Sequence, residues 1–425
     1  MRALVVAVAL AALLPLAAIF PAMTGDRHSS GAWQNRASPA AGRSTDTALS
    51  DGLGVGLAPA GDQRPRRGEG TIVIWARGDL SPRFAEAVAG LPQVTATAHV
   101  RSSTLGLVAS RTAEGIPTDA LSNGFRIPVS VAALDPPQYA ATLPPGPERE
   151  ALLALAPGQA LLSQTGAQSR RIGGGGEIDL VGLTGLDIVG VVADNSVGRA
   201  EIVLHAADAA AAGLDEDGTV FLRHDAAPGA ETVALTEQIE ALVPADLTAR
   251  IVDVAAGAPR RPAPLVLSLA QVKAHFGEFP YRPRAGVREI DVDPAFAVNH
   301  IVKADVPILG SVTCHEKIID DLRQALQQIV ETHLASAIDP DRYAGCYHPR
   351  RISTSSQRLS HHSWGIAIDL NVDLSLPDLG PPPHPGVIAA FQAHGFRWGG
   401  DFLHPDNHHF EWVGEATPSS PATNP

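Results

Sequence analysis

Hydrophobic and polar positions in the first half of the chain form short runs separated by turn residues. Residues 71–76 are almost entirely apolar, residues 94–100 alternate with a period of two, and residues 177–194 contain two further short runs. Such runs are typical of β-strands. Residues 84–89 instead show helical spacing, after a Ser-Pro pair that is common where helices begin. The pattern predicts an α+β domain over residues 70–255.

The second half contains an amphipathic helix pattern and ends in a polar tail. Within residues 315–334, apolar positions recur three and four residues apart, which predicts a helix that packs one face on a core. These positions are Ile318, Ile319, Leu322, Leu326, Ile329 and Val330. A proline-rich linker at residues 256–264 precedes this half. We therefore expect a second domain over residues 265–415 and a disordered tail over residues 416–425.

The chain begins with a long uncharged run. Residues 3–23 carry no charge, and as a helix they would span roughly 31 Å, about the thickness of a bilayer core. Arg2 precedes the run, which favours an orientation with the rest of the chain outside the cytoplasm. We expect residues 1–23 to be a single-pass membrane anchor, or alternatively a cleaved signal peptide that leaves a secreted protein. Residues 24–69, rich in Gly, Ser, Ala and Pro, are expected to be a disordered linker.

Charge and cysteine content narrow the class of protein. The 425 residues carry a formal net charge of −13, which argues against a broad nucleic-acid-binding surface. Two cysteines, Cys314 and Cys346, favour a single disulfide in an exported protein. Zinc ligation by cysteine is the less favoured alternative, because neither residue belongs to a C-x-x-C pair. Eleven of the 16 histidines lie between His300 and His409, so histidine chemistry is expected in the second half.

A short stretch, SHHSWGIAID (residues 360–369), combines histidines, small residues and a terminal carboxylate. If GIAIDL forms a strand, Gly365, Ala367 and Asp369 face one side and the branched residues face the core. The small side chains then leave a hollow with Asp369 at its end. His362 lies just before the strand and is expected to lean over this hollow.

A second stretch, HPDNHHFEWV (residues 404–413), places His409 on the polar face of a strand whose other face is aromatic. If this strand lies beside GIAIDL, then His362, Asp369 and His409 converge. Two imidazoles and one carboxylate with an open fourth position are typical of catalytic zinc. Asp406 precedes His409 by three residues and is the expected general base for a zinc-bound water.

These two stretches resemble a known family. The motif S-x-H-x-x-G-x-A-x-D at residues 360–369 and the motif D-x-x-H-F-E-W at residues 406–412 are similar to those of LAS-type zinc peptidases. This group comprises lysostaphin-like, D-alanyl-D-alanine carboxypeptidase and hedgehog-type domains. The similarity is greatest to the D-alanyl-D-alanine carboxypeptidase branch, which includes vancomycin-resistance carboxypeptidases. The resemblance covers residues 306–413.

The resemblance implies a fold, a cofactor and a site. The fold is an α+β peptidase domain with an antiparallel sheet, and the cofactor is Zn²⁺. The implied zinc ligands are His362, Asp369 and His409, and the implied general base is Asp406. The sequence departs from the family pattern in its further histidines, which are His361, His404 and His408.

The predicted activity is hydrolysis of peptidoglycan stem peptides as a D-alanyl-D-alanine carboxypeptidase. An L-alanyl-D-glutamate-type endopeptidase of the cell wall is one alternative, and a non-catalytic zinc-containing module that binds cell-wall peptide is another. A carboxypeptidase must hold the terminal carboxylate of its substrate, which a guanidinium does through two hydrogen bonds. Just upstream of the metal strand, Arg350 is the preferred residue for this role and Arg351 the second choice.

The first half carries no catalytic motif. Four glycines at residues 173–176 lack the Gly-Lys-Ser/Thr that completes a phosphate-binding loop, so we interpret them as a turn. Residues 160–194 comprise a predicted helix, this turn and then strands that end in IVGVV. They resemble the extracytoplasmic core domain of macrolide-exporter-type ABC permeases. The resemblance implies that residues 70–255 sense or bind a partner, such as another protein of the cell envelope.

Overall fold

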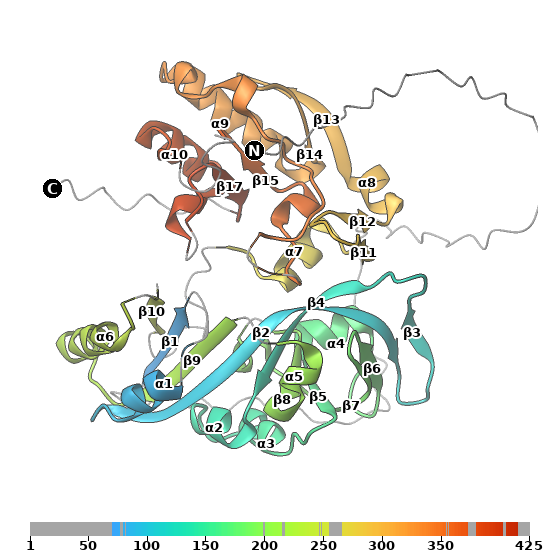
Figure 1. Ribbon diagram of the computed structural model, residues 1–425, viewed down its shortest axis with the longest axis vertical. Helices are drawn as coiled ribbons and strands as arrows, with labels where there is room; N and C mark the ends of the chain where they lie inside the picture. The colour runs from blue at the N-terminus through green and yellow to red at the C-terminus, as the bar shows by residue number, and fades with distance from the viewer. Residues whose placement is uncertain are drawn as a thin grey trace, which may run out of the picture. The chain divides into compact units, whose positions relative to one another are not determined.

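The structure is a computed structural model, and it describes most of the chain from Gly70 onward. The described residues are 70–76, 80, 82–198, 200–214, 217–245, 247, 249–254, 266–353, 355, 357–372, 380–402 and 405–414. The predicted membrane anchor, both predicted linkers and the predicted tail lie outside these residues. Among the helices that are described, none is both long and apolar enough to cross a membrane. The described chain is a mixed α/β structure, as the sequence predicts (Figure 1).

Ten strands of the first half form one sheet. They are β1 (Gly70–Ala76), β2 (Val94–Arg111), β3 (Pro117–Ala120), β4 (Ile127–Leu134), β5 (Gln159–Ser163), β6 (Glu177–Leu180), β7 (Leu183–Val192), β8 (Ile202–His205), β9 (Asp217–His224) and β10 (Ala249–Val254). Their spatial order is β10-β1-β9-β2-β4-β8-β5-β7-β6, with β3 paired to β2. Because β6 also pairs with β2, the part of the sheet from β2 to β6 closes into a ring.

The helices of the first half are short and lie between these strands in the chain. They are α1 (Pro82–Ala89), α2 (Pro136–Ala141), α3 (Pro147–Leu153), α4 (Gln164–Arg170), α5 (Ala209–Ala212) and α6 (Ala230–Leu242). The apolar runs predicted at residues 71–76 and 177–194 correspond to β1 and to β6 with β7. Residues 94–100 are only the start of β2, whose later residues are held by pairing with β4 and β6.

The second half combines helices with several small sheets. Its helices are α7 (Leu269–Phe276), α8 (Pro294–His300), α9 (Ile319–Glu331) and α10 (Pro385–Ala393). Its strands are β11 (Tyr281–Pro283), β12 (Ile290–Val292), β13 (Ile301–Val306), β14 (Gly310–His315), β15 (Ala367–Asp369), β16 (Phe396–Trp398) and β17 (His409–Trp412). Strand β11 pairs with β12, β13 pairs with β14, and β15-β17-β16 form a three-stranded antiparallel sheet. This last sheet carries the candidate site.

Helix α9 begins later in the chain than the sequence pattern predicts. His315 is the last residue of β14, where it pairs with Ile301, and its Nδ1 accepts a hydrogen bond from the amide of Lys317. The chain then passes through a short 3₁₀ turn before the helix begins at Ile319. The predicted apolar face is buried except at Val330, which is 39% exposed. Strand pairing with β13 therefore overrides the helical pattern at the start of this segment.

Aromatic residues anchor the sheet that carries the site. Phe410 of β17 is fully buried and packs against Phe391 of α10, with ring centroids 4.5 Å apart. Phe391 also meets Phe396 of β16 edge-on at 5.4 Å. Trp364 is fully buried, and its indole N–H donates to the carbonyl of Gly277 at 3.0 Å. Burial of a phenylalanine such as Phe410 contributes roughly 1.5–3 kcal/mol. This burial holds the aromatic face of β17 against the core and turns its other face, with His409, toward the site.

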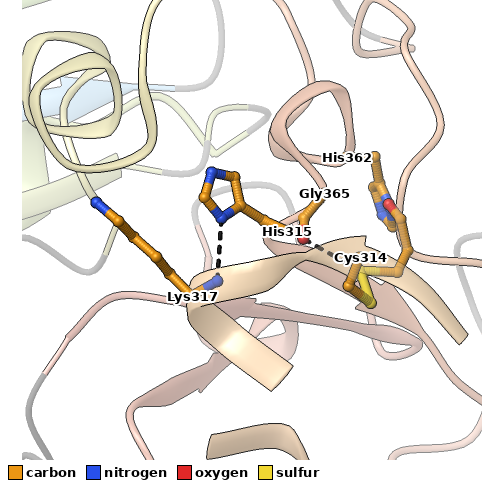
Figure 2. The surroundings of a disulfide bond; sticks show 6 residues. Cys314, His315, Lys317, His362 and Gly365 are labelled. Atoms are coloured by element: carbon orange, nitrogen blue, oxygen red, sulfur yellow. Dashed lines mark hydrogen bonds between the residues drawn. A yellow bond between two sulfur atoms is a disulfide. The ribbon is translucent and has the colours of Figure 1, made fainter. Parts of the chain in front are cut away.

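The two cysteines form a disulfide bond (Figure 2). Cys314 belongs to β14, Cys346 lies in the loop after α9, and both are buried. They are 32 residues apart in sequence. A crosslink that closes a loop of this size stabilises the fold by about 3–4 kcal/mol, mainly because it restricts the unfolded chain. The bond joins the loop before the candidate site to a core strand.

Candidate metal centre

His362 lies in a short 3₁₀ turn, η6 (His361–Trp364), whose two ends have clear sequence signals. The hydroxyl of Ser360 accepts the amide N–H of His362 at the start of the turn. Gly365 ends it in the left-handed conformation with φ +67°, and a Cβ there would lie 2.8 Å from the backbone nitrogen of His315. The predicted strand is therefore wrong at its start, because Gly365 closes a turn and the strand begins only at Ala367. This turn brings His362 back toward the short strand β15.

Three side chains converge at the end of the small sheet. In the pairing of β15 with β17, Asp369 lies directly opposite His409. Nε2 of His362 lies 3.1 Å from Oδ1 of Asp369, and Nδ1 of His409 lies 3.0 Å from the same oxygen. One ligand atom from each side chain lies within 4.8 Å of the others, and the described residues contain no second group of this kind. The structure thus brings together three residues that could hold a metal ion.

The second nitrogen of each imidazole is held by a buried acceptor. His362, only 1% exposed, donates from Nδ1 to the carbonyl of Cys346 at 2.8 Å. His409 donates from Nε2 to the carboxylate of Glu411 at 3.2 Å. Glu411 is also buried and interacts with Nδ1 of His361 at 2.9 Å. These partners orient both rings, so that the other nitrogen of each ring points to the centre of the cluster.

The electrostatics of the cluster suit a cation. Burial tends to raise the pKa of Asp369, but the charge and hydrogen bonds of the two imidazoles outweigh burial and hold that pKa well below its usual range. Burial tends to lower the pKa of His409, but hydrogen bonds to Asp369 and Glu411 raise it to about 10. Burial lowers the pKa of His362. The carboxylate of Asp369 is thus ionised. The proton on Nδ1 of His409, which faces this carboxylate, occupies a position that a metal cation can take.

Asp406 lies in the loop before β17, within electrostatic range of the cluster. Its Oδ1 accepts the amide N–H of His408 at 3.1 Å, and its own amide donates to the carbonyl of Gly399 at 3.0 Å. Burial raises the pKa of the Asp406 carboxyl above its usual value. The charge on His409 opposes this rise, and the charge on Asp369 adds to it. The structure therefore holds a partly buried carboxylate whose charge interacts with those of His409 and Asp369.

The two predicted substrate-binding arginines have different surroundings. Arg350 donates from Nη2 to Oδ2 of Asp369 at 3.2 Å, and its Nη1 lies 3.0 Å from Nδ1 of His348. Arg351 instead donates to the carbonyl of Val287. Arg350 therefore lies at the cluster, whereas Arg351 points to a different part of the domain.

Of the additional histidines, His361 and His408 are described, and neither belongs to the cluster. His361 interacts with Glu411, and His404 lies outside the described residues. His408 is buried and lines a pocket of about 310 Å³. The lining of this pocket includes Asn371 and Asn407, which are close in sequence to residues of the cluster.

The sequence motifs did not assign two residues, Glu411 and Tyr343, to the site. Glu411 alternates with His409 along β17, and this spacing is a signal that both side chains share one face. The hydroxyl of Tyr343 is buried without a hydrogen-bond partner among the described residues, and burial together with the charge of Asp369 raises its pKa. No local pattern marks Tyr343, because its place depends on how the loop after α9 folds back onto β15.

The second half also matches a family model over the segment that holds this cluster. Residues 354–412 match the model described as D-alanyl-D-alanine carboxypeptidase. The match confirms the resemblance that the two sequence motifs carry, and it relates this segment to peptidases. Among curated proteins, the comparison finds no match to the chain.

Two solved structures resemble part of the chain. One is the periplasmic region of MacB from Actinobacillus actinomycetemcomitans, at 13% identity and a TM-score of 0.29, covering 43% of this chain and 89% of that one. The other is the extracellular domain of the noncanonic ABC-type transporter YknZ from Gram-positive bacteria, at 10% identity and a TM-score of 0.25. That comparison covers 40% of this chain and 88% of the transporter domain.

Proposed function

We propose that the second half of the chain is a zinc-dependent peptidase that cleaves stem peptides of peptidoglycan, acting as a D-alanyl-D-alanine carboxypeptidase. The observation that carries this proposal is the convergence of His362, Asp369 and His409 within the segment that matches the family model. Asp406 and Arg350 lie beside these residues and supply the further groups that such a reaction needs.

The three converging side chains fit Zn²⁺. Each imidazole directs one nitrogen inward because its other nitrogen is bound to a buried acceptor. Asp369 directs Oδ1 inward while its Oδ2 accepts from Arg350. Two nitrogens and one oxygen leave one tetrahedral position open, as in catalytic zinc sites. When bound, Zn²⁺ supplies a Lewis acid for the scissile carbonyl and lowers the pKa of a bound water to about 7.

Asp406 is the proposed general base. Because burial raises its pKa, this carboxylate is a stronger base than an exposed aspartate. The amide of His408 holds Oδ1, so the carboxylate has a fixed orientation. In the proposed reaction, Asp406 accepts a proton from the attacking water and returns it to the leaving amine.

Arg350 is the proposed contact for the terminal carboxylate of the substrate. In Arg350→Ala, we expect kcat/KM for a peptide with a free carboxylate to fall about 10- to 100-fold, because a charge-assisted hydrogen bond contributes about 1.5–3 kcal/mol. Because Arg350 also donates to Oδ2 of Asp369, its loss weakens zinc binding as well, so the rates are compared at saturating zinc. Steady-state kinetics and metal analysis measure both quantities. Arg351→Ala is the matched control and should retain normal kinetics, because Arg351 points away from the cluster.

The same peptide with an amidated C-terminus provides a direct check on this role. Wild-type enzyme should cleave the acid much faster than the amide. In Arg350→Lys, this preference for the acid should be larger than in Arg350→Ala but smaller than in the wild type, because lysine lacks the forked geometry. Equal cleavage of acid and amide by the wild type would contradict a carboxylate contact and would support the endopeptidase alternative.

Glu411 is proposed to orient His409 toward the metal. In Glu411→Gln, the shape of the side chain is kept but the negative charge is lost, so zinc affinity should fall about 10- to 100-fold. Competition with a chelator measures this affinity. His361→Ala removes only the other partner of Glu411 and should have a smaller effect. Unchanged affinity in Glu411→Gln would refute the role.

A digestion of purified muropeptides tests the proposed function as a whole. The carboxypeptidase releases the terminal D-alanine from a pentapeptide stem, which mass spectrometry detects as the loss of one alanine. Cleavage between L-alanine and D-glutamate would instead identify the endopeptidase. Binding of the peptide without cleavage by the zinc-loaded protein would identify a non-catalytic binding module.

The proposed cellular location rests on the proposed substrate and on the disulfide. We propose that the peptidase lies outside the cytoplasm, where peptidoglycan is found and where disulfides persist. The predicted N-terminal segment would anchor it to the cell membrane, or direct its secretion if it is cleaved. Residues 70–255 are proposed to bind a partner in the envelope, on the basis of their sequence resemblance to exporter domains.

A further inference from the structure

The loop after α9 contacts the metal cluster at several points. We call residues 344–350 the bracing segment. Its Cys346 carbonyl accepts Nδ1–H of His362 at 2.8 Å, and its His348 amide donates to the carbonyl of His362 at 2.9 Å. The amide of Ala344, the first residue of the segment, donates to the carbonyl of Asp369 at 3.0 Å. The bracing segment therefore supports two of the three residues of the cluster.

The bracing segment is attached to the rest of the domain at its middle and at its last residue. Its last residue, Arg350, forms an isolated β-bridge with Glu289, which directly precedes β12. Near Cys346, a hydrogen bond of 2.9 Å runs from the amide of Tyr347 to the carbonyl of Thr313 in β14. The disulfide adds a covalent link from Cys346 to the same strand. The position of the Cys346 carbonyl thus depends on β14.

The turn that carries His362 is bound to the same strand. The amide of His315, next to Cys314, donates to the carbonyl of Gly365 at 2.9 Å, and the sulfur of Cys346 lies 3.2 Å from this carbonyl. Figure 2 shows His362 and Gly365 beside the disulfide. Cys314, Cys346 and His362 are 0%, 2% and 1% exposed. With so little exposure, water has no access to replace a displaced carbonyl as the partner of His362.

We propose that the Cys314–Cys346 disulfide is a positioning element of the metal site. It holds the Cys346 carbonyl in the place where it orients His362 and directs Nε2 of that ring to the metal. This inference rests on the zinc site proposed above. It also implies that the site reaches full affinity only after the chain has been oxidised, which links metal loading to an oxidising compartment.

The zinc affinity of the full chain tests this inference. In Cys314→Ala/Cys346→Ala, affinity measured by competition with a chelator should fall about 10- to 100-fold, the effect typical of losing the outer partner of a ligand. Leu326→Ala is the control, because it empties a fully buried position in α9 and destabilises the same core without removing the crosslink to the bracing segment. The control should keep the zinc affinity of the wild type. Circular dichroism confirms that each protein is folded at the temperature used.

A second measurement uses the wild-type sequence and does not depend on folding of the variant. Because the disulfide is buried, a phosphine is applied in denaturant, the protein is then refolded, and thiol titration verifies the reduction. The disulfide gains two electrons and two protons to become two thiols, and the phosphine takes oxygen from water to become its oxide. Zinc release into a chelator should then be at least about tenfold faster than from the oxidised protein. Visible spectra of Co²⁺-loaded oxidised and reduced protein should differ, because the orientation of one ligand has changed.

The outcomes separate this inference from the proposed function. Equal zinc affinity in the wild type and the double alanine variant, or equal release rates before and after reduction, would overturn the positioning role while leaving the zinc peptidase intact. An equal loss in Leu326→Ala would also overturn it, because general stability would then explain the effect. Absence of zinc binding by the oxidised wild type would overturn the proposed function itself.

Discussion

Replacement of His409 or His362 by alanine is expected to lower zinc affinity by more than about 100-fold, and the purified variants should contain little metal. Each change removes a direct ligand, and loss of an outer partner alone already costs about 10- to 100-fold. Both imidazoles lie about one hydrogen-bond length from Oδ1 of Asp369, which places the three side chains around one point. Elemental analysis of dialysed protein gives the zinc content, which should be about one per chain in the wild type.

The neighbouring histidine supplies the matched control. His408→Ala removes an imidazole next to His409 in the sequence, but this side chain lines a pocket and is not part of the cluster. The variant should therefore keep its zinc. Full metal content in both His409→Ala and His362→Ala would refute the assignment of the ligands. Loss of metal in His408→Ala with retention in His409→Ala would show that the adjacent histidine is the ligand.

Asp406→Asn is expected to lower kcat about 10²- to 10⁴-fold while zinc content stays normal, which is the usual effect of losing a general base. Asparagine keeps the size of the side chain and an oxygen that can accept the amide N–H of His408, so the loop should keep its structure. The amide cannot take a proton from water at neutral pH. Kinetics with a stem-peptide substrate, together with metal analysis of the same preparation, measure the two quantities.

An exposed carboxylate nearby distinguishes the base from a general effect of charge. Asp401→Asn changes the net charge by the same amount, but Asp401 is exposed and should leave kcat unchanged. Near-normal turnover in zinc-loaded Asp406→Asn would exclude Asp406 as the base. A parallel loss of zinc would instead assign Asp406 a role in holding the metal.

Local sequence patterns predicted many elements of this fold because those elements satisfy their hydrogen bonds and bury their side chains close to home. The apolar run at residues 71–76 is β1, and the two runs within residues 177–194 are β6 and β7. The antiparallel pairing of β15 with β17 agrees with the expectation that these two segments lie side by side. The extension of β2 to Arg111 was not predicted, since pairing with β4 and β6 determines it.

The spacing of residues in two short motifs was sufficient to predict which side chains converge. His362, Asp369 and His409 belong to segments whose turn and strand signals lie within a few residues of them. The start of the predicted strand was wrong, because Gly365 adopts a positive φ where it approaches the backbone of His315. That contact joins residues that are distant in the sequence, and no pattern local to either one reveals it.

The sequence by itself determined which groups are available for chemistry. These are the imidazoles of His362 and His409, the carboxylates of Asp369 and Asp406, and the guanidinium of Arg350. Only the tertiary structure decided how each group is oriented. The carbonyl of Cys346 binds His362, and the carboxylate of Glu411 binds His409. It also decided that Arg350, and not Arg351, reaches Asp369. The physical reason is that the orientation of a buried polar side chain depends on its hydrogen-bond partners, and these partners come from distant parts of the chain.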